Sequence, residues 1–231
     1  MKLNKRLLTL SEMVNEHYDL VWDCCCDHGL LGFKILADGV IKELNFVDLV
    51  PDITNKLKRK LQQHGHHLPK DAQWQVLCQD VSEIALAKLA SQLPNDARQL
   101  VIISGIGGDL IIEILNKLTP NCSGLHVDFL LCPVQHTYKL RKRLRELQFK
   151  SKDERLVLEN NRGYELMLIS HSAGQAMSLT GSDMMWKNNP LASDYLNKLI
   201  GHYQRSLRAN QRDLLYQSAL DDYCRLKEQC C

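Results

Sequence analysis

The 231-residue sequence has no apolar run close to the roughly 18 residues that a membrane-spanning helix needs. Its first ten residues contain Lys2, Lys5 and Arg6 but neither an apolar segment nor a small-residue cleavage site, so we expect no signal peptide. It also has no low-complexity tract. These absences, with 45% apolar residues, favour a cytoplasmic protein with an ordinary hydrophobic core and no membrane partner.

The nine cysteines include no pair with Cys-x-x-Cys spacing. Cys24, Cys25 and Cys26 are consecutive, and on a strand their side chains would point alternately to opposite faces, which prevents easy convergence on one metal ion. We therefore interpret the cysteines as reduced thiols in apolar surroundings and expect no metal. Zinc binding or disulfides are the alternative.

The net charge of +2 neither requires nor excludes a nucleic-acid partner, because local patches matter more than the total. One stretch, residues 139–155, has eight basic and three acidic side chains, a local net charge of +5. The basic residues are Lys139, Arg141, Lys142, Arg143, Arg145, Lys150, Lys152 and Arg155. We expect the first five of these to contact RNA phosphates, with an ordinary solvated helix face as the alternative.

Apolar runs typical of buried strands alternate with amphipathic stretches typical of helices. The expected strands cover 20–24, 44–48, 74–78, 100–104 and 127–132, and the expected helices cover 30–38, 53–64, 84–93, 110–118 and 138–147. Five such alternations predict an α/β fold with a parallel sheet covered on both faces. Near-continuous apolar strands fit a sheet that is buried on both sides.

The pattern then changes to two adjacent strands, 155–159 and 164–170, separated by the turn residues 160–163. A mostly parallel sheet closed by an antiparallel hairpin is the Rossmann-like layout of class I methyltransferases, which use S-adenosylmethionine. We expect that domain over 1–172, beginning with a helix at 3–17. The remainder, 173–231, is expected to be a helical, coiled-coil-like extension that follows a connector at 172–189 and has a break near Asn210.

The loop after the first strand is the first candidate cofactor site, because ligands of such sheets bind beyond the carboxyl ends of the strands. Class I methyltransferases have Asp/Glu-x-Gly-x-Gly-x-Gly here. This chain keeps Asp23 and Gly29 but has Cys25 and Asp27 at the two middle positions. We expect Asp23, Cys25 and Gly29 to bind the cofactor.

The next three strand ends supply further candidates. Asp48 is placed to accept hydrogen bonds from ribose hydroxyls and Asp80 from the adenine amine, although either carboxylate could instead cap a helix. Ser104, Gly105 and Gly107 follow the fourth strand, where glycines allow a close approach to the methionine part of the cofactor. A tight strand-to-helix turn is the alternative there.

Three segments in combination resemble the bacterial tRNA (adenine-22-N1)-methyltransferase family: Asp23-x-x-x-Asp27-His28, residues 103–108, and Glu159 with residues 163–165. The resemblance implies a Rossmann-like domain, a helical C-terminal part, S-adenosylmethionine as cofactor, and methylation of adenine N1 in tRNA. The sequence departs from the family at Cys25, where the family has glycine, and at Gly29, where it has alanine. These differences suggest a divergent member.

The same interpretation predicts which residues contact the tRNA substrate and which one takes part in catalysis. Asp27 is the candidate catalytic residue, because its carboxylate could accept from adenine N6 and stabilise the positive charge that develops on the base. His28 could donate to an RNA phosphate or cap the following helix. Gly108, Pro133 and Gln135 follow the fourth and fifth strands, where the incoming base would lie.

Two other functions stay open. One is a methyltransferase acting on a small molecule or a protein. The other is a non-catalytic RNA-binding module with a vestigial cofactor pocket, for which Cys25 is the main argument. The oligomeric state, monomer or weak dimer, is not determined by the sequence.

Overall fold

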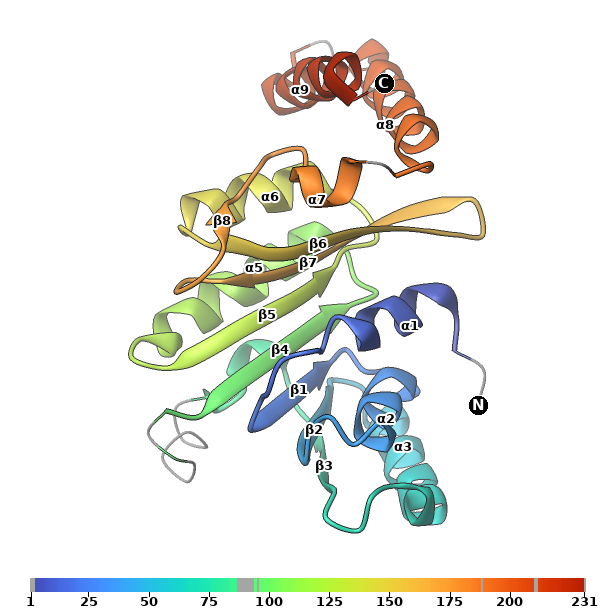
Figure 1. Cartoon of the computed structure of the whole chain (residues 1–231), viewed down its shortest axis with the longest axis vertical. Helices are drawn as coiled ribbons and strands as arrows, with labels where there is room; N and C mark the ends of the chain where they lie inside the picture. The colour runs from blue at the N-terminus through green and yellow to red at the C-terminus, as the bar shows by residue number, and fades with distance from the viewer. Residues whose placement is uncertain (1–2, 87–93, 95, 188, 210–211, 231) are drawn as a thin grey trace.

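An eight-stranded sheet forms the centre of the computed structural model, which describes residues 3–86, 94, 96–187, 189–209 and 212–230 (Figure 1). The strands are β1 Leu20–Cys24, β2 Glu43–Asp48, β3 Gln73–Cys78, β4 Arg98–Ser104, β5 His126–Cys132, β6 Lys150–Glu159, β7 Arg162–Ser170 and β8 Gln175–Ala176. Their order is β3-β2-β1-β4-β5-β7-β6-β8. β1 to β5 run parallel, and β7 and β6 pair antiparallel. The predicted sheet, including its closing hairpin, is confirmed.

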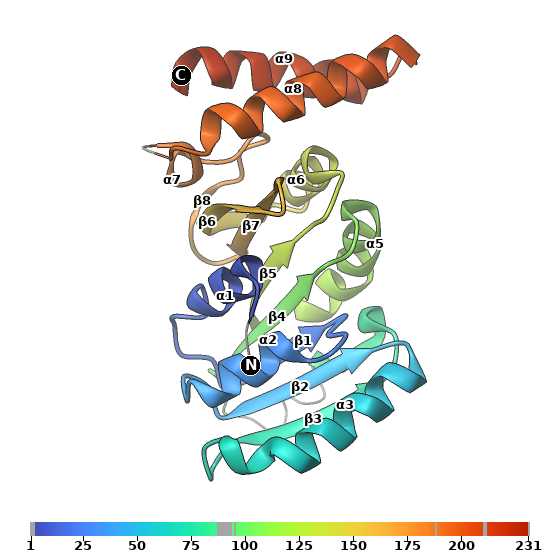
Figure 2. The same ribbon diagram turned by 90° about the vertical axis from the view of Figure 1, so that its right-hand side faces the viewer.

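Helices cover both faces of this sheet (Figure 2). They are α1 Lys5–Glu12, α2 Leu30–Ala37, α3 Pro51–His64, α5 Gly108–Leu118, α6 Thr137–Glu146, α7 Asp183–Trp186, α8 Ala192–Ala209 and α9 Leu214–Cys230. Short 3-10 segments lie at η1 Gly65–His67, η2 Val81–Glu83 and η3 Thr119–Cys122. α1, α2 and α3 pack on one face, and α5 and α6 pack on the other. No helix in the described ranges is long and apolar enough to cross a membrane.

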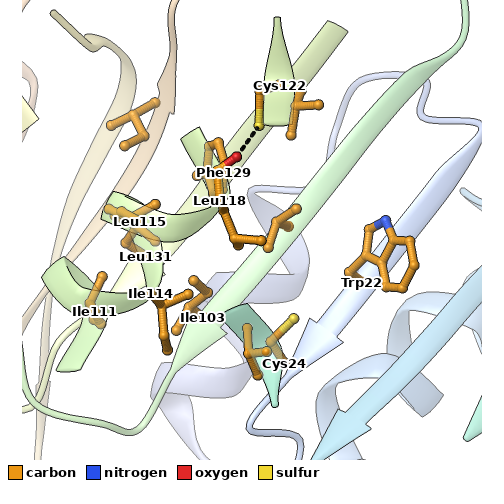
Figure 3. Packing of buried hydrophobic residues seen from close by; sticks show 14 of the residues in the cluster. Trp22, Cys24, Ile103, Ile111, Ile114, Leu115, Leu118, Cys122, Phe129 and Leu131 are labelled. Atoms are coloured by element: carbon orange, nitrogen blue, oxygen red, sulfur yellow. Dashed lines mark hydrogen bonds between the residues drawn. The ribbon is translucent and has the colours of Figure 1, made fainter. Parts of the chain in front are cut away.

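Each face of the sheet has its own hydrophobic core, because successive side chains of a strand point to opposite faces. Trp22 and Cys24 of β1 face the α5 side, whereas Val21 faces the α1 and α2 side. Figure 3 shows the α5 side, where Ile103 and Phe129 from neighbouring strands lie among the helix's aliphatic side chains. The seven cysteines described with side chains are all free thiols: four are buried, Cys25 and Cys224 are half-buried, and Cys78 is exposed.

Two predicted segments differ from the structure, and a third lies mostly outside the described residues. The first helix covers Lys5–Glu12 and not 3–17, because Asn4 caps its start and the chain after Glu12 leaves the helix to bury Val14 and Tyr18 in the core. The connector at 172–189 contains β8 and α7. The helix expected over 84–93 lies mostly outside the described residues; the preceding segment is η2, which ends in extended backbone at Ile84.

The C-terminal helices α8 and α9 pack side by side and share an apolar cluster with α6, α7 and β6. Tyr138 of α6 lies among Tyr203 and Tyr223 of the two C-terminal helices. The predicted break near Asn210 is confirmed, since α8 ends at Ala209 and α9 begins at Leu214. Tight packing on α6 brings this helix pair close to the loop between β5 and α6.

Candidate active site

Four adjacent strands bring the predicted cofactor residues to one edge of the sheet. Asp80 follows β3, Asp48 ends β2, Asp23 lies near the end of β1, and Ser104 ends β4. These strands are parallel neighbours, so their carboxyl ends coincide. The structure therefore brings these residues to one edge, as predicted, even though more than 50 residues separate Asp23 from Asp80 in the chain.

A cavity of about 310 Å³ opens at this edge. Six of the predicted site residues line it: Asp23, Cys25, Asp27, His28, Ser104 and Gly105. The other lining residues are Arg6, Leu7, Cys26, Leu30, Leu31 and Ile106. Gly105 is exposed and has a φ of 84°, a conformation that favours glycine and leaves backbone open to a ligand.

Asp23 is the buried carboxylate of the cavity, with 3% of its surface exposed. Its Oδ2 accepts a hydrogen bond from the backbone N–H of Gly32 at 2.9 Å. A Cβ at position 32 would lie 2.8 Å from that oxygen, so the contact depends on glycine. Burial raises the pKa of Asp23 to about 7, with a smaller contribution from the negative charge of Asp48. A cationic group in the cavity would favour its ionised form.

The loop after β1 turns through three residues of left-handed backbone: Cys25 at φ 56°, Asp27 at φ 46° and Gly29 at φ 64°. Glycine adopts this conformation without strain, and aspartate tolerates it better than most residues. Left-handed backbone at position 25 suits glycine, the residue that the family resemblance led us to expect there, better than cysteine. Burial raises the pKa of Cys25 to about 12, so its thiol stays protonated at neutral pH.

Asp48 and Asp80 do not line the cavity. Asp48 Oδ1 accepts from the N–H of Val50 at 3.0 Å, and its Oδ2 accepts from the N–H of Asp27 at 3.3 Å. Asp80 caps η2 by accepting from the N–H of Ser82 at 2.8 Å, a bond that lowers the pKa of Asp80. Both carboxylates therefore stabilise loops by accepting backbone hydrogen bonds, and their contacts with ribose and adenine remain predictions.

His28 is exposed and does not cap α2, so that interpretation is wrong. The cap residue is Gly29, which has no side chain to offer. The His28 ring lies 3.8 Å from Asp27 at the mouth of the cavity, where it remains a candidate for contact with RNA.

Backbone hydrogen bonds join the loops after β4 and β5. Gly105 N–H donates to the carbonyl of Cys132 at 3.2 Å, and Val134 N–H donates to that of Ile106 at 3.0 Å. Gly108 N–H donates to the carbonyl of Gln135 at 2.9 Å. A Cβ on Gly108 would lie 2.7 Å from a backbone oxygen of the facing loop, so glycine permits this approach. The role of Gly108 shown here is structural, and its contact with substrate remains a prediction.

Pro133 and Gln135 line a second cavity of about 440 Å³ on the other side of the joined loops. Aromatic rings of the C-terminal helices, including Tyr203 and Tyr216, form its opposite wall. Gln135 also packs over Gly107, where a Cβ would come within 3.3 Å of the Gln135 amide nitrogen. The structure thus places Gln135 against Gly107, the residue that follows Ile106 of the first cavity.

In the basic stretch 139–155, the structure separates one buried arginine from the cations at the surface. Arg141 is fully buried, with Nε donating to Glu165 at 2.7 Å and Nη1 donating to Glu154 at 2.6 Å. The prediction that Arg141 contacts RNA is therefore wrong: the phase of α6 turns its side chain toward β6 and β7, where two carboxylates hold it. Tyr195 of α8 also donates to Glu165, at 3.0 Å, so this buried network ties α8 to the sheet.

The other predicted phosphate ligands lie at the surface of α6. Lys139 pairs with Asp109 at 2.7 Å, and Arg143 pairs with Glu146 at 3.0 Å. Lys142 and Arg145 are exposed and make no ion pair with any residue that the structure describes. These two are the cations best placed to meet an RNA backbone.

Sequence reasoning missed Arg6. This residue of α1 lines the cofactor cavity, and its guanidinium carbon lies 4.9 Å from the ring centroid of Tyr164. Its Nε is buried and has no hydrogen-bond partner among the described residues. In the sequence Arg6 is one of two adjacent cations at the start of an amphipathic helix, and that pattern says nothing about where the helix docks.

A parallel sheet closed by an antiparallel hairpin, with a cavity at the carboxyl ends of its first and fourth strands, defines a class I methyltransferase fold. The family described as "Methyltransferase domain" matches residues 3–167, and the chain belongs to this family. No curated protein matches the sequence.

Solved structures similar over the whole chain have low sequence identity. TrmK of M. capricolum, in complex with S-adenosylhomocysteine, has a TM-score of 0.75 at 17% identity, covering 100% of this chain and 98% of its own. The B. subtilis m1A22 tRNA methyltransferase TrmK has a TM-score of 0.70 at 18% identity, covering 98% and 96%. A candidate tRNA (m1A22) methyltransferase of Streptococcus pneumoniae, bound to S-adenosylmethionine, has a TM-score of 0.72 at 19% identity, covering 98% and 100%. The fold is shared to the end of the C-terminal helices.

Proposed function

We propose that this chain methylates N1 of an adenine in tRNA and uses S-adenosylmethionine as the methyl donor. The observation that carries the proposal is the convergence of Asp23, Asp27, Ser104 and Gly105 on one cavity at the predicted sheet edge. Similarity over the full chain to structures described as m1A22 tRNA methyltransferases supports the substrate assignment. Action on tRNA would fit the cytoplasmic location expected from the sequence.

The residues present suit this cofactor. Asp23 offers a buried carboxylate for an ammonium group, and Gly105 offers open backbone beside it. Asp48, one strand further along, faces the loop that would surround the nucleoside. When bound, S-adenosylmethionine supplies an electrophilic methyl group on a sulfonium centre.

The protein's own contribution would be alignment and charge stabilisation. Neutral adenine has a free lone pair at N1, so no residue has to remove a proton before attack. Asp27 would accept a hydrogen bond from the N6 amino group and offset the positive charge that grows on the base. Its side chain is 67% exposed at the cavity mouth, where an incoming base can reach it. An adenine inside folded tRNA must leave its stack to arrive there.

The test is incubation of the purified chain with unmodified tRNA and labelled S-adenosylmethionine, followed by mass spectrometry of the nucleosides. The expected product is 1-methyladenosine, formed only when tRNA and chain are both present. Labelling of a protein or a small molecule in an extract, with unlabelled tRNA, would favour the alternative substrates. Binding of tRNA without any methyl transfer would favour a non-catalytic RNA-binding module.

A further inference from the structure

Arg6 occupies an unusual position for a surface helix residue. It is half-buried, it lines the cofactor cavity, and its enclosed Nε has no partner among the described residues. A buried donor without an acceptor costs roughly 1–3 kcal/mol, and more for a charged group, so such groups are rarely left unused. The arrangement points to an acceptor that arrives with a ligand.

The protein holds this guanidinium in place before any ligand binds. Asn4 caps α1 by accepting from the N–H of Leu7 at 2.8 Å, and the N–H of Lys5 donates to Glu159 of β6 at 3.0 Å. These bonds fix the first turn of α1 against the end of the hairpin. Tyr164 of β7 then supports the guanidinium through a cation–π contact. Contacts with β6 and β7, far from α1 in the sequence, thus preorganise Arg6 toward the cavity.

Arg6 and Asp23 give the cavity one cationic and one anionic group. No direct ion pair joins them. Asp23 bonds instead to the backbone of Gly32, and burial raises its pKa, so it lacks a cation of its own. Two unpaired groups of opposite charge in one cavity match a zwitterionic ligand, whose ammonium would meet Asp23 and whose carboxylate would meet the guanidinium. Amino acids carry this pair of charges on one carbon.

We infer that Arg6 binds the α-carboxylate of the methionine part of the cofactor and so selects ligands that carry an intact amino-acid group. This inference rests on the proposed function for the identity of the cofactor. Arginine suits the task because its planar fork can donate two parallel hydrogen bonds to a carboxylate. Arg6 is a binding and positioning residue, since the carboxylate is remote from the methyl group that is transferred.

Calorimetric titration with two ligands tests the inference without relying on activity. S-adenosylhomocysteine has both charges of the amino-acid group, and its decarboxylated analogue keeps only the ammonium. The substitution Arg6→Gln should weaken S-adenosylhomocysteine about 10- to 100-fold, the range for a lost hydrogen bond to a charged group. The same variant should bind the decarboxylated analogue as the unsubstituted chain does, which also shows that the variant is folded. Arg6→Lys should recover part of the loss.

Lys5→Gln is the matched control, because it removes an exposed cation one residue away and keeps the backbone bond to Glu159. It should leave both affinities unchanged. Equal weakening of both ligands by Arg6→Gln would overturn the inference and assign Arg6 a purely structural contact with Tyr164. Unchanged binding of both ligands, with weaker binding of tRNA, would overturn it in favour of a phosphate contact. If the unsubstituted chain binds neither ligand, the proposed function fails along with the inference.

Discussion

The backbone N–H of Asp27 donates a hydrogen bond to Oδ2 of Asp48 at 3.3 Å, which joins the loops that follow β1 and β2. The bond fixes the main chain of Asp27 and leaves its side chain, 67% exposed, at the mouth of the cavity. The backbone of Asp27 therefore holds the loop in place, while its carboxylate stays available to a substrate.

Asp27→Ala should therefore abolish most methyl transfer and leave cofactor binding intact. We expect the turnover rate to fall by about 100-fold or more, the usual effect of losing one electrostatic contact in a transition state. The affinity for S-adenosylhomocysteine should change less than about twofold, since the amide that meets Asp48 is retained. Single-turnover assays with tRNA and calorimetry measure the two quantities. Full activity in this variant would remove Asp27 from the mechanism.

Cofactor affinity should depend on pH through Asp23. Burial raises the pKa of Asp23 to about 7 in the free protein, whereas an ammonium group binds its ionised form. Affinity for S-adenosylhomocysteine should rise about tenfold for each pH unit below pH ~7 and level off above it. Asp23→Asn should bind weakly with no such dependence. A flat profile in the unsubstituted chain would argue against an ammonium contact at Asp23.

The raised pKa of Asp23 also has a consequence for stability without ligand. Between pH 3.8, the ordinary pKa of an aspartate, and pH about 7, the folded chain holds a proton on Asp23 that the unfolded chain has lost. The Asp23 contribution to the free energy of unfolding is thus fully favourable below the unfolded pKa and declines as pH rises to about 7. Denaturation of the Asp23→Asn variant should lack this decline, and an equal decline in both proteins would assign it to other groups.

Cys25→Gly should stabilise the fold and bind the cofactor more tightly. Left-handed backbone costs a non-glycine residue about 1–2 kcal/mol, and glycine's greater freedom in the unfolded chain offsets part of that gain. We expect the free energy of unfolding to rise by up to about 1 kcal/mol. Cys25→Ala is the control, because it empties the cavity of the thiol but keeps the strained φ of 56°. Equal stabilisation by both substitutions would point to side-chain crowding.

Arg141→Met should destabilise the protein far more than Arg143→Met. Removing Arg141 leaves the buried carboxylates of Glu154 and Glu165 without their cation, and such losses typically cost about 3–5 kcal/mol. Arg143 is partly exposed and pairs with Glu146 at the surface, where a bridge is worth about 0–1 kcal/mol. Urea denaturation of both variants measures the difference. Similar losses would show that the buried network is not what ties α8 to the sheet.

Binding of tRNA should weaken steeply with salt, and Lys142 and Arg145 should account for part of that slope. They lie three residues apart on α6, so they share one exposed face. Replacing both with alanine should lower the slope of log affinity against log salt by about 1–2. Lys42→Ala, at an exposed lysine just before β2, should leave the slope unchanged. A flat salt response in the unsubstituted chain would exclude phosphate contacts as the main source of affinity.

Much of the fold could be predicted because its determinants are local. Apolar strands alternating with amphipathic helices define the parallel sheet, and Asn160 and Asn161, both in left-handed backbone, close the hairpin as their residue type indicates. The parallel sheet then requires that the residues following its strands share one edge. For that reason Asp23, Asp48 and Ser104 could be placed at one edge of the sheet without any coordinates.

Other features were decided only by tertiary structure. Three arginines of α6 look alike in sequence, yet only the docking of the helix against Glu154 and Glu165 makes Arg141 a buried cation. Arg6 reaches the cavity because Glu159, about 150 residues away, receives the first turn of α1. The periodicity of a segment fixes which residues share a face. The partners of that face depend on which distant elements pack there, and those contacts form only when the whole chain folds.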